Sequence, residues 1–219
     1  MTNPLRNYFN NNRGRLIHKW DHYFDIYHRH FHEYRNQKVT ILEFGVFHGG
    51  SLQMWKDYFG DQAQIIGVDI NPICKQFEED QISIEIGDQE DRNFLKQIAE
   101  KHGPFDIVID DGGHQMNQQI NTFEEIYPYV QEHGIFLVED MLTSYRPTFN
   151  AGYKKPNTFI EYSKNFIDSL HAWHSHEPQF QPDALTTSAF GLHYYDSVLV
   201  IEKKPITQPW HSKTGTPSF

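Results

Sequence analysis

The sequence predicts an α/β fold with a doubly wound, mostly parallel sheet of seven strands. Three observations support this prediction. Short apolar or β-branched runs alternate with segments of helical periodicity along most of the chain. Several runs end in acidic residues, and a glycine-rich turn follows the first of them. The length of 219 residues suits one such domain with additional segments.

The N-terminal part is predicted to be a helical extension over residues 1–36. Residues 1–14 are rich in asparagine, and we expect them to be loose or to face a substrate. Residues 15–36 carry aromatic side chains near helical spacing and predict a helix. If these aromatic side chains are exposed, they could support association into a homo-oligomer.

Histidines alternate at positions 28, 30 and 32 in this extension. A metal clip is one interpretation, because His28 and His32 share a helix face. No third ligand is evident nearby, so we interpret the three as part of a polar, aromatic-rich helix.

The main domain is predicted over residues 37–204 and begins with a strand at 39–44. A glycine-rich turn at 45–50 follows, and Ser51 can cap the helix at 52–59. The next predicted elements are a strand at 65–69, a short helix or turn at 74–79, a strand at 82–86, a helix at 92–102, a strand at 105–110, a helix at 116–131 and a strand at 135–139.

The regular alternation ends after Asp140. Residues 143–156 predict a long loop, which is a candidate for a lid because it follows the acidic strand end directly. A helix at 157–173 and a closing pair of strands at 192–195 and 198–203 come next, and residues 205–219 are expected to be a tail.

Composition limits the classes of partner. The formal net charge of −10 argues against a nucleic-acid backbone or an anionic membrane surface as the main partner. The single cysteine fits a reducing compartment. No signal-peptide pattern and no apolar run near the roughly 18 residues of a membrane span is visible, so we expect a cytoplasmic protein.

Acidic residues lie at or just after the carboxyl ends of the first three predicted strands. They are Glu43, Asp69 and Asp88, and Gly45 follows the first. Glycines at a strand-to-helix turn allow a ligand to approach the backbone, and an acid can bind a ribose diol. Acids without a phosphate-binding pattern argue against NAD or ATP. They favour an adenosyl ligand with a positive sulfonium, S-adenosylmethionine.

Paired acids follow two later strands, in the segments 110–114 (DDGGH) and 139–140 (ED). Asp111, Glu139 and Asp140 form an all-oxygen donor set, which favours Mg²⁺, Mn²⁺ or Ca²⁺ over Zn²⁺. His114 is close enough in sequence to act beside them as a general base. The alternative is structural: helix caps and sheet-edge acids, with His114 as a turn residue bonded to backbone.

Taken in order, these motifs resemble those of class I S-adenosylmethionine-dependent methyltransferases. The resemblance is to the Mg²⁺-dependent sugar O-methyltransferases that tailor macrolides and other rhamnosylated natural products, and cephalosporin-hydroxylase-like proteins are similar too. It covers roughly residues 15–203. Its most specific parts are the segments 42–51 (LEFGVFHGGS), 67–70 (GVDI), 87–89 (GDQ), 110–114 (DDGGH) and 138–140 (VED).

The resemblance implies a role for each matching residue. Asp111, Glu139 and Asp140 would hold the metal, and His114 would be the base. The residues implied to line the cofactor site are Glu43, Gly45, Ser51, Asp69, Asp88, Gln89 and Asp110. Gly113 departs from the pattern, since relatives commonly have serine there, and this difference should alter a local hydrogen bond only.

The expected activity is methyl transfer to a sugar hydroxyl of a natural product or saccharide, so the expected partner is a glycosylated small molecule. Two alternatives stay open. One is methylation of a catechol or phenolic small molecule with the same metal. The other is a non-catalytic partner protein that binds an adenosyl ligand or a metal. A hydroxylase is not favoured, because no 2-His-1-carboxylate set is evident in the sequence.

Overall fold

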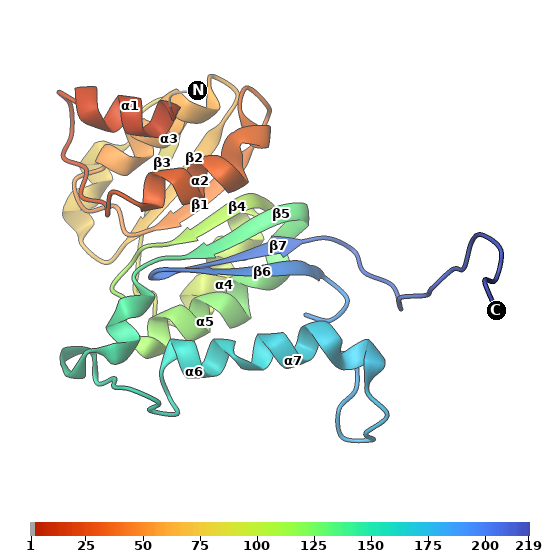
Figure 1. The fold of residues 1–219 in the computed structure, drawn as a ribbon. Coiled ribbons are helices and arrows are strands. Elements are labelled where there is room, and N and C mark those ends of the chain that lie inside the picture. Colours follow the sequence, from red (N-terminus) through yellow and green to blue (C-terminus); the bar gives the residue numbers. More distant parts are fainter. Residues whose placement is uncertain (1–2) are drawn as a thin grey trace.

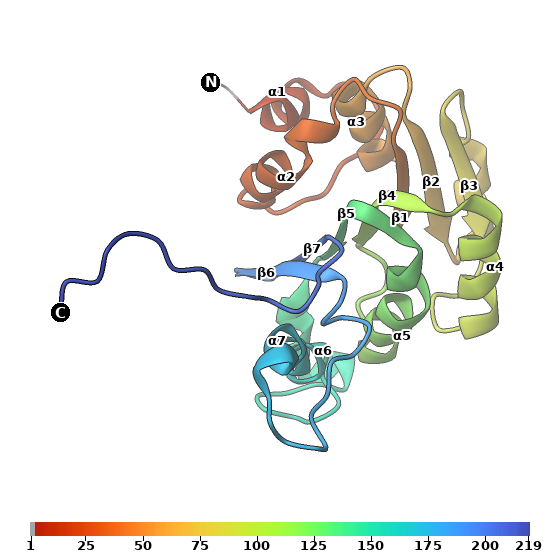
Figure 2. The same cartoon turned by 90° about the vertical axis from the view of Figure 1, so that its right-hand side faces the viewer.

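A seven-stranded sheet forms the centre of the molecule, and helices cover both of its faces (Figures 1 and 2). The computed structural model describes residues 3–219. The strands in chain order are β1 (Thr40–Phe44), β2 (Gln64–Asp69), β3 (Ile82–Ile86), β4 (Phe105–Asp110), β5 (Val130–Val138), β6 (Ala189–Tyr195) and β7 (Val198–Lys203).

The spatial order of the strands is β3-β2-β1-β4-β5-β7-β6. β1 to β5 pair in parallel, and β7 runs antiparallel to both β5 and β6. The order changes direction between β1 and β4, so the predicted doubly wound, mostly parallel sheet is confirmed. The carboxyl ends of β1 and β4 lie side by side at this switch point, where open α/β sheets bind ligands.

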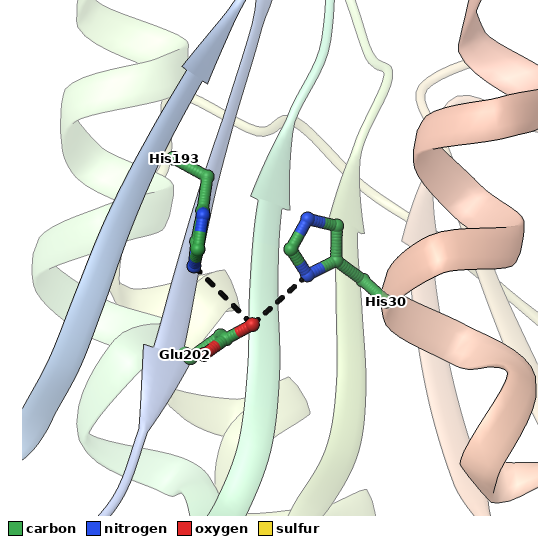
Figure 3. Close-up of side chains that lie close together, drawn as sticks. All are labelled: His30, His193 and Glu202. Atoms are coloured by element: carbon green, nitrogen blue, oxygen red, sulfur yellow. Dashed lines mark hydrogen bonds and ion pairs between the residues drawn. The ribbon is translucent and has the colours of Figure 1, made fainter.

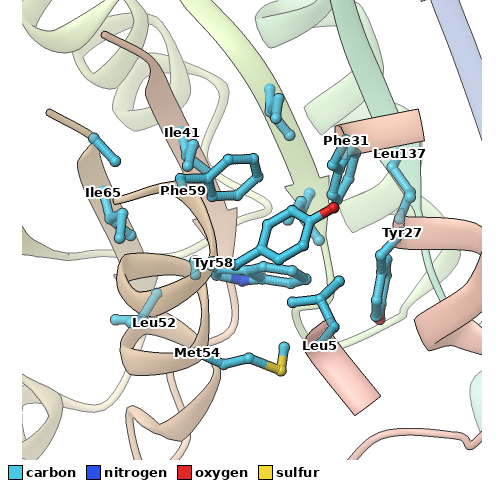
Figure 4. Packing of buried hydrophobic residues seen from close by; sticks show 14 of the residues in the cluster. Leu5, Tyr27, Phe31, Ile41, Leu52, Met54, Tyr58, Phe59, Ile65 and Leu137 are labelled. Carbon is cyan, nitrogen blue, oxygen red and sulfur yellow. The ribbon is translucent and has the colours of Figure 1, made fainter. Parts of the chain in front are cut away.

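The first face of the sheet is covered by α1 (Pro4–Asn11), α2 (Tyr23–Phe31) and α3 (Gly50–Phe59) (Figure 1). Figure 4 shows this core, in which aromatic side chains of α2 and α3 pack against aliphatic side chains of the sheet. Tyr27 and Phe31 are fully buried there. The aromatic residues of α2 therefore belong to the core of the chain and do not form an exposed surface for self-association.

Two expectations for the N-terminal part are wrong. Residues 4–11 form a helix instead of a loose segment, because the Asn3 side chain caps its first turn by accepting from the N–H groups of Leu5 and Arg6. The predicted helix at 15–36 begins only at Tyr23, and a 3₁₀ turn, η1 (His32–Tyr34), continues it.

Residues 16–20 have no regular secondary structure, and their first residue lies against the start of α3. Their backbone approaches Gly50 so closely that a Cβ there would lie 2.3 Å from the carbonyl oxygen of Leu16. This contact carries the N-terminal segment along the carboxyl edge of the sheet.

The second face is covered by α4 (Arg92–His102), α5 (Met116–Ile126), α6 (Phe159–Ser163) and α7 (Asn165–His171) (Figure 1). The helix predicted at 116–131 ends earlier because Pro128 follows. The loop at 143–156 contains short 3₁₀ turns, and whether it moves as a lid stays a prediction. The remaining short helices are η2 (Pro72–Phe77), η3 (Tyr127–Tyr129), η4 (Met141–Tyr145), η5 (Pro147–Phe149) and η6 (Ala172–His174).

The predicted closing strands are confirmed as β6 and β7, although β6 begins three residues earlier than expected. Beyond them, residues 205–219 extend away from the sheet as an exposed tail (Figure 2). Within residues 3–219, every helix is too short or too polar to span a bilayer.

Candidate active site

A cavity opens at the carboxyl edge of the sheet. Its wall includes the turns after β1 to β5 and residues 16–19 from the N-terminal segment. The predicted cofactor-binding residues that line it are Gly45, Ser51, Asp69, Asp88 and Gln89. The same cavity is lined by Asp111, His114 and Asp140 from the predicted chemical site, so the fold brings the two predicted groups together.

The glycine-rich turn is held close to the end of β4. Gly45 has a φ of +92°, and a Cβ at this position would lie 2.0 Å from the carbonyl oxygen of Asp111. Only glycine fits both requirements. Asp69 fixes the same turn from the other side, because its Oδ2 accepts from the N–H groups of Val46 (2.9 Å) and Phe47 (3.1 Å).

Glu43 and Asp110 lie beneath the cavity and do not line it. The Ser51 hydroxyl donates to Glu43 (2.9 Å), and the Gln89 amide donates to Asp110 (2.7 Å). Burial raises the pKa of Glu43 to about 7 and that of Asp110 to about 6. These two acids are therefore in a position to act on a ligand through Ser51 and Gln89.

Asp111, His114 and Asp140 converge at one end of the cavity. Nε2 of His114 lies 3.4 Å from Asp140 Oδ2 and 3.8 Å from Asp111 Oδ1. Nδ1 of His114 is buried and has no hydrogen-bond partner among residues 3–219. One imidazole nitrogen is thus turned toward two carboxylates while the other is left without a proton acceptor or donor.

His114 and Asp140 both adopt a left-handed backbone, with φ values of 54° and 52°. Such conformations are uncommon for residues other than glycine and are found often at functional sites. The Thr143 hydroxyl lies within hydrogen-bond distance of the backbone carbonyls of His114 (3.2 Å) and Asp140 (2.8 Å). The first turn after β5 therefore supports the backbone of both residues.

Glu139, the third predicted metal ligand, turns away from this group. It is buried, and its carboxylate accepts from the Tyr27 hydroxyl (2.6 Å) and from Lys19 Nζ (3.0 Å to each oxygen). Asp111 lies between the two groups, since Lys19 also donates to it. The three predicted acids are thus shared between two partners. Asp111 and Glu139 contact Lys19, while Asp111 and Asp140 lie beside His114.

Lys19 is the main residue that sequence reasoning missed. Its Nζ lies among Asp111, Glu139 and Glu43, the last at 3.6 Å. Burial alone would lower the pKa of Lys19, but the charges of Asp111 and Glu139 raise it well above its usual value. The side chain is therefore an ammonium ion inside the acidic site.

Two aromatic residues of the N-terminal segment were also missed. Trp20 Nε1 and the Tyr23 hydroxyl both donate to Oδ1 of Asp140, at 3.0 and 2.7 Å. These bonds leave Oδ2, the oxygen nearer His114, free of them. Helical spacing in this segment indicated packing only, and no motif connected it with acids more than a hundred residues away.

The carboxylates of Asp111 and Asp140 offer the oxygen ligands that a hard divalent cation prefers. One ligand atom each from Asp111, His114 and Asp140 lies within 4.8 Å of the others. Three carboxyl groups, those of Glu43, Asp111 and Glu139, surround the ammonium of Lys19, and the carboxylate of Asp140 lies on the other side of the group beside His114. The remaining negative charge calls for a further cation or for shared protons.

Residues 42–141 match the family model of a methyltransferase domain. The chain carries a methyltransferase domain. It is 37% identical over 196 residues to the 8-demethyl-8-(2-methoxy-α-L-rhamnosyl)-tetracenomycin-C 3'-O-methyltransferase of Streptomyces olivaceus. This alignment covers 84% of this chain and 50% of the relative. It is 40% identical over 190 residues to the mycinamicin VI 2''-O-methyltransferase of Micromonospora griseorubida, covering 81% and 47%.

The methyltransferase fold is also found in a solved relative. A structure of MycE methyltransferase from the mycinamycin biosynthetic pathway, in complex with Mg and SAH, superimposes with a TM-score of 0.81 at 34% identity. The match covers 93% of this chain and 54% of that one. The chain spans about half the length of the curated relatives it matches. The predicted Rossmann-like methyltransferase fold is confirmed.

Proposed function

We propose that the chain transfers a methyl group from S-adenosylmethionine to a hydroxyl of a sugar on a natural product or saccharide, with a divalent metal ion. One observation carries the proposal. A single cavity holds both the glycine-rich turn after β1 and the Asp111–His114–Asp140 cluster. A cofactor bound along the turn would direct its reactive end toward that cluster.

The cofactor would lie against the wall that contains Gly45, Ser51, Asp69, Asp88 and Gln89. Gly45 allows the turn to pack against the end of β4 and so shapes this wall, while Asp88 and Asp69 supply negative charge suited to a sulfonium-bearing adenosyl ligand. Glu43 and Asp110 would act indirectly, by orienting Ser51 and Gln89.

Asp111 and Asp140 would hold the metal, with Glu139 as the third acid of the set. When bound, S-adenosylmethionine supplies the methyl group, and Mg²⁺ (or Mn²⁺ or Ca²⁺) supplies positive charge next to an acceptor oxygen. Trp20 and Tyr23 fix one oxygen of Asp140, so that its other oxygen faces the site.

His114 would remove the proton from the acceptor hydroxyl. Imidazole is the side chain most often used as a general base in enzymes. Asp140 and Asp111 would stabilise the imidazolium that forms, because both carboxylates face Nε2. Much of the rate would come from holding the two reactants in line.

The class of acceptor is supported by the relatives. Their names specify methylation on a rhamnosyl group of tetracenomycin and on mycinamicin VI. A related structure contains Mg, SAH and mycinamycin VI. A glycosylated small molecule is therefore the substrate that we propose for this chain.

Calorimetric titration with S-adenosylmethionine and S-adenosylhomocysteine, with and without Mg²⁺, tests the cofactor site. We expect micromolar binding of either ligand. Rhamnosylated acceptors and their matched aglycones would then be compared, with a catechol as the phenolic control. Absence of binding under every metal condition would refute the proposal, and preferential methylation of the catechol would refute the sugar acceptor.

A further inference from the structure

A second cluster of metal-ligating side chains lies outside the active site. His30 comes from α2, His193 from β6 and Glu202 from β7 (Figure 3). Glu202 pairs with Ile135 near the middle of β5, whereas the active-site acids follow the end of that strand. Four residues of strand separate the two positions, or about 13 Å.

Figure 3 shows that both imidazole rings face one carboxylate oxygen. Oε1 of Glu202 lies 3.1 Å from His30 Nδ1 and 3.2 Å from His193 Nε2. The three ligand atoms all lie within 4.8 Å of one another. Zinc bonds of about 2.0–2.2 Å in a tetrahedron place ligand atoms roughly 3.3–3.6 Å apart, so the two nitrogen-to-oxygen distances are close to those between ligands of one ion.

The hydrogen bonds of the cluster are incomplete. His193 Nε2 is buried and has no hydrogen-bond partner among residues 3–219, although it faces the Glu202 oxygen. Gly191 lies opposite Glu202 on β6, and a Cβ there would lie 3.3 Å from this nitrogen. A small ion between the rings and the carboxylate would satisfy the unpartnered nitrogen, and the glycine leaves room beside it.

We propose that His30, His193 and Glu202 form a binding site for a borderline transition-metal ion such as Zn²⁺. Two imidazoles and one carboxylate, a combination that was not evident in the sequence because its members lie far apart along the chain, are a zinc donor set. Mg²⁺ and Ca²⁺ instead prefer oxygen ligands throughout. Water would complete the coordination. This inference does not depend on the proposed methyl transfer.

The surroundings of His30 support this assignment. The Tyr195 hydroxyl lies 2.9 Å from Nε2 of His30, so it can accept the N–H that leaves Nδ1 free for a metal. Burial, together with the nearby His193, lowers the pKa of His30. A neutral imidazole is the form that binds metal.

Such an ion would connect segments far apart in the sequence, because His30 and Glu202 are 172 residues apart. It would fasten α2 to the hairpin of β6 and β7. Tyr23 and Tyr27, which hold Asp140 and Glu139, lie on the same helix. The zinc site would therefore stabilise the helix that supports the active-site acids.

The test is a Zn²⁺ titration of the chelator-treated chain by calorimetry, with excess Mg²⁺ present to occupy the oxygen-rich active site. We expect one Zn²⁺ per chain and a higher melting temperature. His193→Ala and Glu202→Gln should lose this ion or bind it at least tenfold more weakly. His32→Ala is the matched control, since His32 lies at the end of the same helix and is exposed.

Tyr195→Phe provides a milder variant in case a ligand substitution prevents folding. It keeps all three ligands, and we expect about 10- to 100-fold weaker binding. Absence of Zn²⁺ binding to the original chain would overturn the proposal. Binding that His193→Ala and Glu202→Gln leave unchanged would also overturn it, because the ion would then occupy other histidines.

Discussion

Replacing Lys19 by methionine would test whether the active-site acids depend on an internal cation. The Lys19 side chain is 3% exposed and contacts carboxylates from three different strand ends. Methionine keeps most of the buried volume but removes the charge. Glu43, Asp111 and Glu139 would then face one another without the ammonium between them.

The expected cost follows from the burial of these groups. Removing one partner of a buried ion pair typically destabilises a protein by about 3–5 kcal/mol, because the other charge stays buried and unpaired. We expect a loss in this range at pH 8. At pH 6 the loss should be smaller, since Glu43, whose pKa is raised by burial to about 7, is largely neutral there.

Urea unfolding at both pH values, in the presence of a chelator, measures the loss. Lys101→Met is the control: Lys101 pairs with Glu85 on the surface, and its loss should cost less than about 1 kcal/mol. Adding Mg²⁺ should restore part of the stability of Lys19→Met, by about 2.7 kcal/mol at one hundred times the dissociation constant.

The double variant Lys19→Met with Glu139→Gln measures the interaction energy between Lys19 and Glu139. Neutralising Glu139 should recover a large part of the lost stability, because the two groups are in direct contact. A loss below about 1 kcal/mol for Lys19→Met at pH 8, or no recovery in the double variant, would refute the reasoning.

Three further predictions concern single groups of the same site. Tyr27→Phe should destabilise the chain by about 1.5–3 kcal/mol in urea unfolding, because it removes the buried hydrogen bond to Glu139; a neutral result would contradict this bond. Folding favours the protonated form of Glu43, so the contribution of Glu43 to the free energy of unfolding should decrease as the pH rises from 4.5 to 7. Glu43→Gln should flatten that slope and stabilise the chain at pH 8 by up to about 3 kcal/mol. His114→Ala should lower methyl transfer by about 10²- to 10⁴-fold while calorimetry shows unchanged binding of S-adenosylhomocysteine; equal loss of both would assign His114 to binding instead.

The central sheet and its acidic strand ends could be predicted because their signals are local. An apolar run followed by Asp111 or Asp140 identifies a buried strand and its carboxyl end within a few residues. Parallel pairing of β1, β4 and β5 then brings such ends together without further information.

The N-terminal contribution could not be predicted, because its signal is not local. Trp20 and Tyr23 fit the helical spacing of their neighbours, yet Trp20 lies outside the helix and both bind Asp140. The path of residues 16–20 is fixed by a backbone contact with Gly50, which no periodicity reveals. His30 likewise meets its partners only once β6 and β7 lie beside α2.

The distance along the chain between Lys19 and its partners bears on how the molecule is synthesised. Lys19 and Glu139 are 120 residues apart, and Tyr27 and Glu139 are 112 apart. On the ribosome, Lys19 and Tyr27 emerge long before Glu139, and contacts of such separation form slowly. The contacts of Lys19 and Tyr27 with Glu139 can therefore form only after β5 has been synthesised, so the N-terminal part of the active site waits for more than a hundred further residues.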